Sequence, residues 1–168
     1  SNNFMFESAP ILNIDNLQLT QDKLHSLIEY NEIKKIIKEK SLKLNYLEVG
    51  AGSGRTTETI IRLDKRVNKY VIADLPPALY VNYLRIKNTF KNLNVKMCEN
   101  ANSNEDLQKF INENDVLFIF PHQIKYFNDN FFDISLAIDC LHEMDKKIIN
   151  KYMNLFNLKS KYLYYKVW

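Results

Sequence analysis

The sequence is poor in the residues that mark several large classes of protein. Its 168 residues include only three glycines, four prolines, two cysteines and one tryptophan. Cys98 and Cys140 lie far apart without metal-ligand spacing, so a disulfide framework or a zinc site is not expected. Two reduced thiols favour a cytoplasmic protein. No apolar run reaches membrane-spanning length, and no signal peptide is visible.

The sequence also lacks the clustered positive charge that nucleic-acid-binding proteins use. The net charge is +3, and the lysines are scattered along the chain without forming a basic block. This pattern argues against a nucleic-acid partner. A hydrophobic content of 46% and a charged content of 26% are ordinary for one globular domain, which we place over residues 1–168.

The first 40 residues are expected to form a helical lead-in to this domain. Residues 1–19 show no regular pattern, and the periodicity predicts a helix over 21–40 with a break near Asn31. Thr20 is a suitable N-cap for this helix. The apolar face of the helix is predicted from Leu24, Ile28, Ile33, Ile36 and Ile37.

From residue 44 onward, short apolar segments alternate with helical patterns. Strands are predicted at 46–49, 70–73, 95–97, 116–120, 132–139 and 162–168. Helices are predicted at 55–63, from Pro76-Pro77 onward, at 105–112 and after an Asp145 cap. This alternation predicts βαβ units and a mostly parallel sheet, which places a Rossmann-like core over residues 44–168.

All three glycines fall in one segment, Glu48-Val49-Gly50-Ala51-Gly52-Ser53-Gly54, directly after a predicted strand. A sharp turn from strand to helix and a closely approaching ligand both require missing side chains there. The third glycine comes one residue earlier than in the dinucleotide pattern G-x-G-x-x-G, whose last position is Arg55 here. The Glu48 carboxylate would repel a pyrophosphate but suits a cationic amino-acid end. The alternative is a tight structural turn.

An acidic residue follows the next predicted strand. Asp74 lies 20 residues after Gly54, where nucleotide-binding α/β folds place a carboxylate on the ribose hydroxyls. Its two oxygens can accept hydrogen bonds from both hydroxyls. Asp74 could also cap the helix that Pro76-Pro77 opens, and the two roles are compatible.

Further segments resemble a known family. They are YVIADLPPALY (70–80), LFIFPHQ (117–123), FDISLAIDCLHEM (132–144) and YYKVW (164–168). Together with the glycine segment, they resemble the sugar O-methyltransferases of bacterial surface-polysaccharide clusters, which are class I S-adenosylmethionine-dependent methyltransferases. The resemblance covers about residues 44–168. It implies a Rossmann-like three-layer α/β sandwich, S-adenosylmethionine as cofactor, and methylation of a sugar hydroxyl in polysaccharide biosynthesis.

The resemblance also implies roles for individual residues at the cofactor. The residues implied are Glu48, Gly50, Gly52 and Gly54 at the methionine part, Asp74 at the ribose, Leu75 at the adenine, and His122 and Gln123 at the adenine edge. Many members carry an acidic residue at the adenine edge, and this chain has none. Gln123 could accept the hydrogen bond of the adenine amino group instead. The alternative for His122 is a solvated loop residue.

The catalytic base is predicted after the strand at 132–139. His142 can accept a proton near neutral pH, and Glu143 could orient it or bind a sugar hydroxyl. Asp139 is the reserve base. The alternative is that His142 only begins the following helix. No acidic pair shows metal-ligand spacing, so no metal is expected.

Two expectations concern the ends of the chain and its partners. The family's seven-stranded sheet ends with an antiparallel hairpin, whereas this sequence starts at Ser1 and stops at Trp168, near the end of the corresponding fifth strand. We therefore expect a fragment or a truncated form without the hairpin. The aromatic strand at 162–168 is then predicted to be an exposed edge that forms a homodimer.

Two other functions remain open. A non-catalytic S-adenosylmethionine-binding module would keep the fold without turnover. Methylation of nucleic acid is less favoured, because Asp74-Leu75-Pro76-Pro77 lies after the second strand of the core and is not the Asn/Asp-Pro-Pro-aromatic signature of base chemistry.

Overall fold

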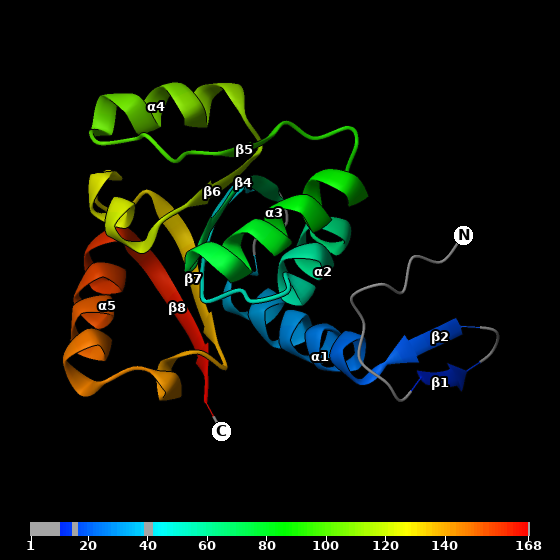
Figure 1. Ribbon diagram of the computed structural model, residues 1–168. Helices are drawn as coiled ribbons and strands as arrows, with labels where there is room; N and C mark the ends of the chain where they lie inside the picture. Colours follow the sequence, from blue (N-terminus) through cyan, green and yellow to red (C-terminus); the bar gives the residue numbers. More distant parts are fainter. Residues whose placement is uncertain (1–10, 15–16, 39–41, 168) are drawn as a thin grey trace.

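The computed structural model describes residues 11–14, 17–38 and 42–167, and its centre is a six-stranded sheet (Figure 1). The strands are β3 (Leu44–Val49), β4 (Val67–Ala73), β5 (Val95–Met97), β6 (Val116–Ile119), β7 (Phe132–Ile138) and β8 (Ser160–Lys166). Their order across the sheet is β5-β6-β4-β3-β7-β8. Every neighbouring pair is parallel, as the alternation of strands and helices predicts.

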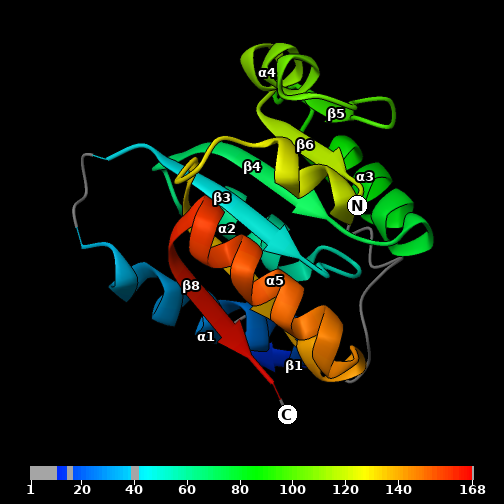
Figure 2. The same cartoon turned by 90° about the vertical axis from the view of Figure 1, so that its left-hand side faces the viewer.

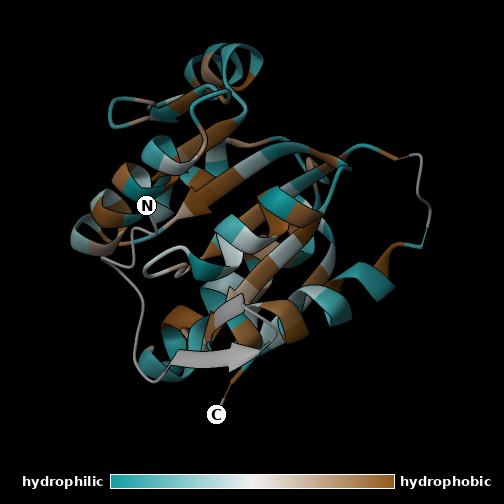
Figure 3. Ribbon diagram, turned by 90° about the vertical axis from the view of Figure 1, so that its right-hand side faces the viewer, coloured by the Kyte–Doolittle hydropathy of each residue, from teal (hydrophilic) through white to brown (hydrophobic). Residues whose placement is uncertain are grey.

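Helices cover both faces of this sheet (Figures 1 and 2). One face carries α1 (Gln21–Ile36), α2 (Arg55–Leu63) and α3 (Pro76–Thr89). The other carries α4 (Asn104–Glu113), the 3-10 helix η1 (Pro121–Tyr126), the 3-10 helix η2 (Leu141–Glu143) and α5 (Lys146–Lys159). The strands between them are mostly hydrophobic, and the helices turn hydrophilic residues outward (Figure 3). The chain is thus a three-layer α/β sandwich.

Local chemistry explains why several elements begin where they do. Gly54, in the left-handed conformation, is the N-cap of α2. Proline occupies the first turn of α3, and Leu79 and Ile86 of this helix are buried. The Asp145 carboxylate accepts a hydrogen bond from the Ile148 N–H at 2.9 Å and caps α5. These three helix starts confirm the sequence predictions.

The prediction of irregular structure up to residue 19 is wrong for the described part of that segment. β1 (Ile11–Ile14) and β2 (Leu17–Thr20) form a separate antiparallel pair. Each strand has four residues, which is too short for an alternating pattern to be recognised. Residues 1–10 lie outside the described residues. Thr20 caps α1 as predicted, accepting a hydrogen bond from the Lys23 N–H at 3.2 Å.

Two details of the α1 prediction are also wrong. The helix continues through Asn31 without a break and ends at Ile36, and residues 39–40 lie outside the described residues. Of the predicted apolar face, Ile33 and Ile37 are buried and Ile36 packs against the core, which confirms part of the prediction. Ile28, however, is 62% exposed, and Ser26 and Glu29 are buried in its place. The apolar periodicity misplaces this face because its central residue is a glutamate whose charge is paired inside the protein.

Smaller differences concern the strand ends. β4 begins three residues before the predicted start at Tyr70, and β8 runs from Ser160 to Lys166 instead of 162–168. β8 forms one edge of the sheet, with Tyr162 and Tyr165 exposed. Pairing of this edge with a second copy stays a prediction. No helix in the described residues is long and apolar enough to cross a membrane.

A buried ion-pair cluster joins α1 to the core. The Arg55 guanidinium donates to both oxygens of the Glu29 carboxylate, at 2.7 and 3.1 Å. It also approaches the Asp139 carboxylate at 3.3 Å. The Lys166 ammonium of β8 lies 3.1 Å from Glu29 and 3.6 Å from Asp139. Two carboxylates and two cations therefore hold the first helix, α2, the end of β7 and the last strand together.

We predict that Glu29→Ala lowers the free energy of unfolding by about 3 kcal/mol, because it leaves the partly buried charge of Arg55 without its main partner. The matched control is Glu32→Ala on the same helix, whose ion pair with Lys35 is exposed and should contribute below about 1 kcal/mol. Urea unfolding followed by circular dichroism measures both. Equal losses in the two variants would contradict the prediction.

Candidate functional site

The sheet has a topological switch point between β3 and β7. After β3 the chain passes to α2 on one face, and after β7 it passes to α5 on the opposite face. The loops that follow these adjacent strands lead to opposite faces of the sheet. Ligands in open α/β sheets bind at the carboxyl ends of the strands at such a point, and we call this region the crevice. The site residues predicted from the sequence all lie at the carboxyl ends of β3, β4, β6 and β7.

Two glycines of the loop pack closely against side chains of the protein, and the third faces open space. Gly50, Gly52 and Gly54 have φ values of +68°, +54° and +80°, which L side chains rarely adopt. A Cβ on Gly50 would lie 2.5 Å from the Cβ of Cys140, and one on Gly54 would collide with the Asn82 side chain. A Cβ on Gly52 would have no described atom within 4 Å. The space above Gly52 is therefore where a ligand can approach the backbone.

Asp74 lies beside this open space and is tied to the loop. One carboxylate oxygen accepts from the Gly52 N–H at 2.9 Å, and the other accepts from the Leu75 N–H at 2.7 Å. Each oxygen keeps a second lone pair for another donor. Burial raises the pKa of Asp74, the two backbone N–H groups oppose that rise, and the nearby Glu143 adds to it. Leu75 follows with 66% exposure, as an apolar surface next to the carboxylate.

The Glu48 side chain points into the protein interior and not toward the open space at Gly52. Its side chain is buried, and one oxygen accepts hydrogen bonds from the Thr57 and Tyr70 hydroxyls, each at 2.6 Å. Burial raises the pKa of this carboxyl, while both hydroxyls lower it. Glu48 thus links β3 to α2 and β4. Its contact with the methionine part of a cofactor stays a prediction.

The residues predicted at the adenine edge lie in η1 and differ in exposure and in hydrogen bonding. His122 is exposed, and its ring stacks on Phe120 with 5.9 Å between centroids. Gln123 is fully buried: its oxygen accepts from the Phe120 N–H at 2.7 Å, and its nitrogen donates to the Cys98 and Ala101 carbonyls at 2.8 Å. The Gln123 amide therefore holds this loop together, and its role toward adenine stays a prediction.

The candidate bases lie beyond β7. Asp139 has a left-handed φ of +55°, and its side chain serves as counter-ion to Arg55 and Lys166. His142 and Glu143 are exposed in η2, and no hydrogen bond joins them within the described residues. Because the charge of Glu143 contributes to the raised pKa of Asp74, Glu143 lies near the same crevice.

Other residues at the crevice were not predicted. Cys140 packs on Gly50 and its thiol donates to the Val49 carbonyl at 3.2 Å. Asn82 is buried against Gly54, and neither polar atom of its side chain has a hydrogen-bond partner among the described residues. Burial, then Cys140 and Asp74, raise the pKa of Tyr152 on α5. Only its position on a helical face signalled Tyr152 in the sequence, and nothing signalled Asn82.

Comparison with known proteins identifies the class of fold. No family model and no curated protein matches the chain. The methyltransferase domain of bacterial CtHen1 is similar in structure, with a TM-score of 0.51, 14% identity, 83% of this chain covered and 61% of that chain. The pyocyanin biosynthetic protein PhzM gives a TM-score of 0.42 and 17% identity over 73% of this chain and 29% of its own. This chain thus spans less than two thirds of either.

The likeness to CtHen1 and the observed topology together establish the architecture. The chain has a Rossmann-like α/β fold, with a parallel sheet and helices on both faces, that is similar to the fold of this methyltransferase domain. At 14% identity the likeness concerns the fold alone. The described residues contain no group of three His, Cys, Asp or Glu side chains that could hold a metal ion.

We predict that Gly54→Ala destabilises the protein more than Gly52→Ala. Both variants place an L residue at positive φ, which costs about 1–2 kcal/mol. Only the Gly54 variant also forces a Cβ into Asn82, and such overpacking adds about 1–3 kcal/mol. Urea unfolding of both variants measures the difference. If Gly52→Ala is the less stable of the two, the close contact at Gly54 is not what constrains the loop.

Proposed function

We propose that the chain binds S-adenosylmethionine and takes part in methyl transfer to a hydroxyl group, with a sugar as the acceptor. The observation that carries the proposal is the open space above Gly52, next to the Asp74 carboxylate and at the switch point of the sheet. A small ligand can touch the backbone there and hydrogen-bond to a carboxylate at the same time. The methyltransferase type of fold supports the proposal.

The residues at the crevice fit the three parts of this cofactor. The loop around Gly52 leaves room for the methionine part, and Asp74 retains acceptor capacity for two ribose hydroxyls. The exposed Leu75 offers an apolar surface to the adenine. When bound, S-adenosylmethionine supplies a methyl group activated by its sulfonium. The protein would hold the acceptor in line with that group and remove a proton from its hydroxyl.

The charges around the crevice favour a neutral acceptor over an anionic one. Asp74 and Glu143 lie near one another, and both are carboxylates. A phosphate-bearing acceptor such as a nucleic acid would be repelled by these charges, whereas a sugar hydroxyl would not. This electrostatic argument supports the sugar acceptor that the sequence resemblance implies.

One observation favours a second candidate, a non-catalytic module that binds the same cofactor. Asp139 is engaged by Arg55 and Lys166, and His142 is not hydrogen-bonded to Glu143 in the described structure. A base that is oriented before the substrate arrives is therefore not assembled at this end of β7. The two candidates share the cofactor site and differ in turnover.

Cofactor choice is tested by calorimetry. We predict that the protein binds S-adenosylhomocysteine but not NAD, because Arg55 replaces the last glycine of the dinucleotide motif. Gly52→Val should abolish binding, since its side chain fills the space that the ligand needs. Ser53→Val is the matched control, because Ser53 is exposed in the same loop and should leave the affinity nearly unchanged. Binding of NAD, or normal binding by Gly52→Val, would refute the proposal.

The base is tested by measuring cofactor affinity and turnover separately. We predict that His142→Ala keeps its affinity for S-adenosylhomocysteine and loses about 10²–10⁴-fold in methyl transfer to sugar acceptors. Glu143→Ala tests the orienting role, and Asp139→Asn should chiefly lower stability because Asp139 pairs with Arg55. His122→Ala is the control histidine and should change affinity instead of turnover. Methyl transfer at the parent rate by His142→Ala would exclude His142 as the base.

A further inference from the structure

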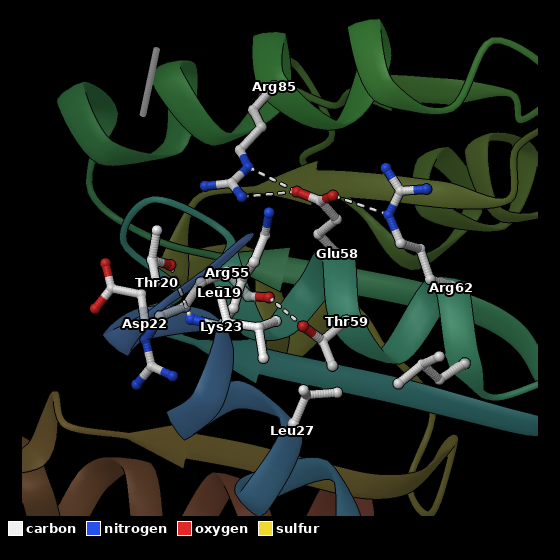
Figure 4. A pocket seen from close by; sticks show the side chains of 11 residues that line it. Leu19, Thr20, Asp22, Lys23, Leu27, Arg55, Glu58, Thr59, Arg62 and Arg85 are labelled. Carbon is white, nitrogen blue, oxygen red and sulfur yellow. Dashed lines mark hydrogen bonds and ion pairs between the residues drawn. The ribbon is translucent and has the colours of Figure 1, made fainter. Parts of the chain in front are cut away.

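A cavity of about 350 Å³ lies on the outer side of α2, between the start of α1 and α3 (Figure 4). Its lining residues come from the end of β2, the first two turns of α1, the whole length of α2, and Arg85 in α3. None of the residues predicted to bind the cofactor lines it. Its volume is at the lower end of the range for small-molecule sites. The cavity is therefore a second concave surface with a chemistry of its own.

Positive charge dominates one wall of this cavity. Arg85 reaches from α3 and donates to the Glu58 carboxylate at 2.7 and 3.0 Å, and Arg62 donates to the same carboxylate at 2.8 Å (Figure 4). One carboxylate thus serves two guanidinium groups, so this trio carries a net charge of +1. Arg55, another lining residue, finds its counter-ion in Glu29, outside the cavity lining.

The Arg62 guanidinium has hydrogen-bond donors that are not used within the described residues. Its Nε atom binds Glu58, and its guanidinium lies over the Phe90 ring at 5.0 Å. The terminal nitrogen atoms have no hydrogen-bond partner among the described residues. The side chain is 53% exposed, so a ligand can reach it from solvent. A planar guanidinium with free terminal N–H groups is suited to a carboxylate or sulfonate.

The lining also contains leucines, which lie among the polar residues Thr20, Asp22, Lys23 and Thr59. Leu27 on α1 and Leu63 on α2 both line the cavity, and they remain 39% and 46% exposed. Leu19, at the end of β2, lines it as well. Leucines that remain exposed around a concave surface favour an apolar ligand body over a fully polar one.

We propose that this cavity binds a small organic anion with an apolar body. The anionic end lies against Arg62 and Arg85, and the body lies against Leu27 and Leu63. The charge of the trio and the exposed leucines carry the proposal together, and it does not depend on the cofactor proposed above. Arg85 also donates to the Ser53 carbonyl of the glycine loop at 3.3 Å, so the two sites must be separated experimentally.

The probe is 8-anilinonaphthalene-1-sulfonate, which carries a sulfonate on an aromatic body. Fluorescence titration of the full chain should show one saturable site. Leu27→Glu should weaken binding at least about tenfold, because it replaces the apolar contact with the body of the probe by a charged carboxylate. Ile28→Glu is the matched control, since Ile28 is the next residue, more exposed, and does not line the cavity. It should bind as the parent does.

A second pair of variants tests the cationic wall. Arg62→Gln should also weaken binding about tenfold. Lys65→Gln, at an exposed lysine outside the cavity lining, should leave binding unchanged. N-phenyl-1-naphthylamine, which has the same body without the sulfonate, should bind at least about tenfold more weakly. Circular dichroism and urea unfolding show that each variant is folded as the parent is.

Several results would overturn the proposal. They are the absence of a saturable site, equal effects of Leu27→Glu and Ile28→Glu, unchanged binding by Arg62→Gln, and equal affinity for the uncharged analogue. The last experiment repeats the probe titration in the presence of saturating S-adenosylhomocysteine. If it displaces the probe, the probe occupies the cofactor crevice and the cavity is not its site. If the protein does not bind S-adenosylhomocysteine at all, the proposed function fails while the cavity is still tested by the variants.

Discussion

Close backbone packing at the glycine loop is the constraint on which the crevice depends. Gly50 admits the Cys140 side chain and so brings the ends of β3 and β7 together. Gly54 admits Asn82 and so sets the position of α3, the helix that begins just after Asp74. A Cβ at Gly52 would meet no atom of the described residues within 4 Å, and this leaves the opening. The three glycines of the chain thus supply two contacts and the gap between them.

Elements that depend on local chemistry could be predicted from the sequence. The bounds of α2 and the Asp145 cap of α5 follow from neighbouring residues, and each agrees with the structure. The parallel sheet follows from short apolar segments separated by helices, because such segments can only be buried on both faces. The gathering of the predicted site residues at one edge of the sheet follows from this topology as well.

What the sequence could not reveal depends on partners that are remote in the chain. Glu29 looks like a surface residue until Arg55 and Lys166 are placed beside it. Glu48 looks like a ligand to a cationic group, yet Thr57 and Tyr70 bind its carboxylate inside the protein. Both faces of β3 are buried, so no alternation of polar and apolar residues indicates where such a side chain points. Only the assembled sheet and helices identify these partners.

The cluster around Glu29 also relates the fold to the order in which the chain is made. Arg55 leaves the ribosome 26 residues after Glu29, whereas Lys166 follows 137 residues after it. The two carboxylates and two cations are balanced only after β8 has been synthesised and has paired with β7. In a nascent chain that lacks β8, Arg55 is therefore the cation that pairs with Glu29, and Lys166 adds its charge only when β8 is in place.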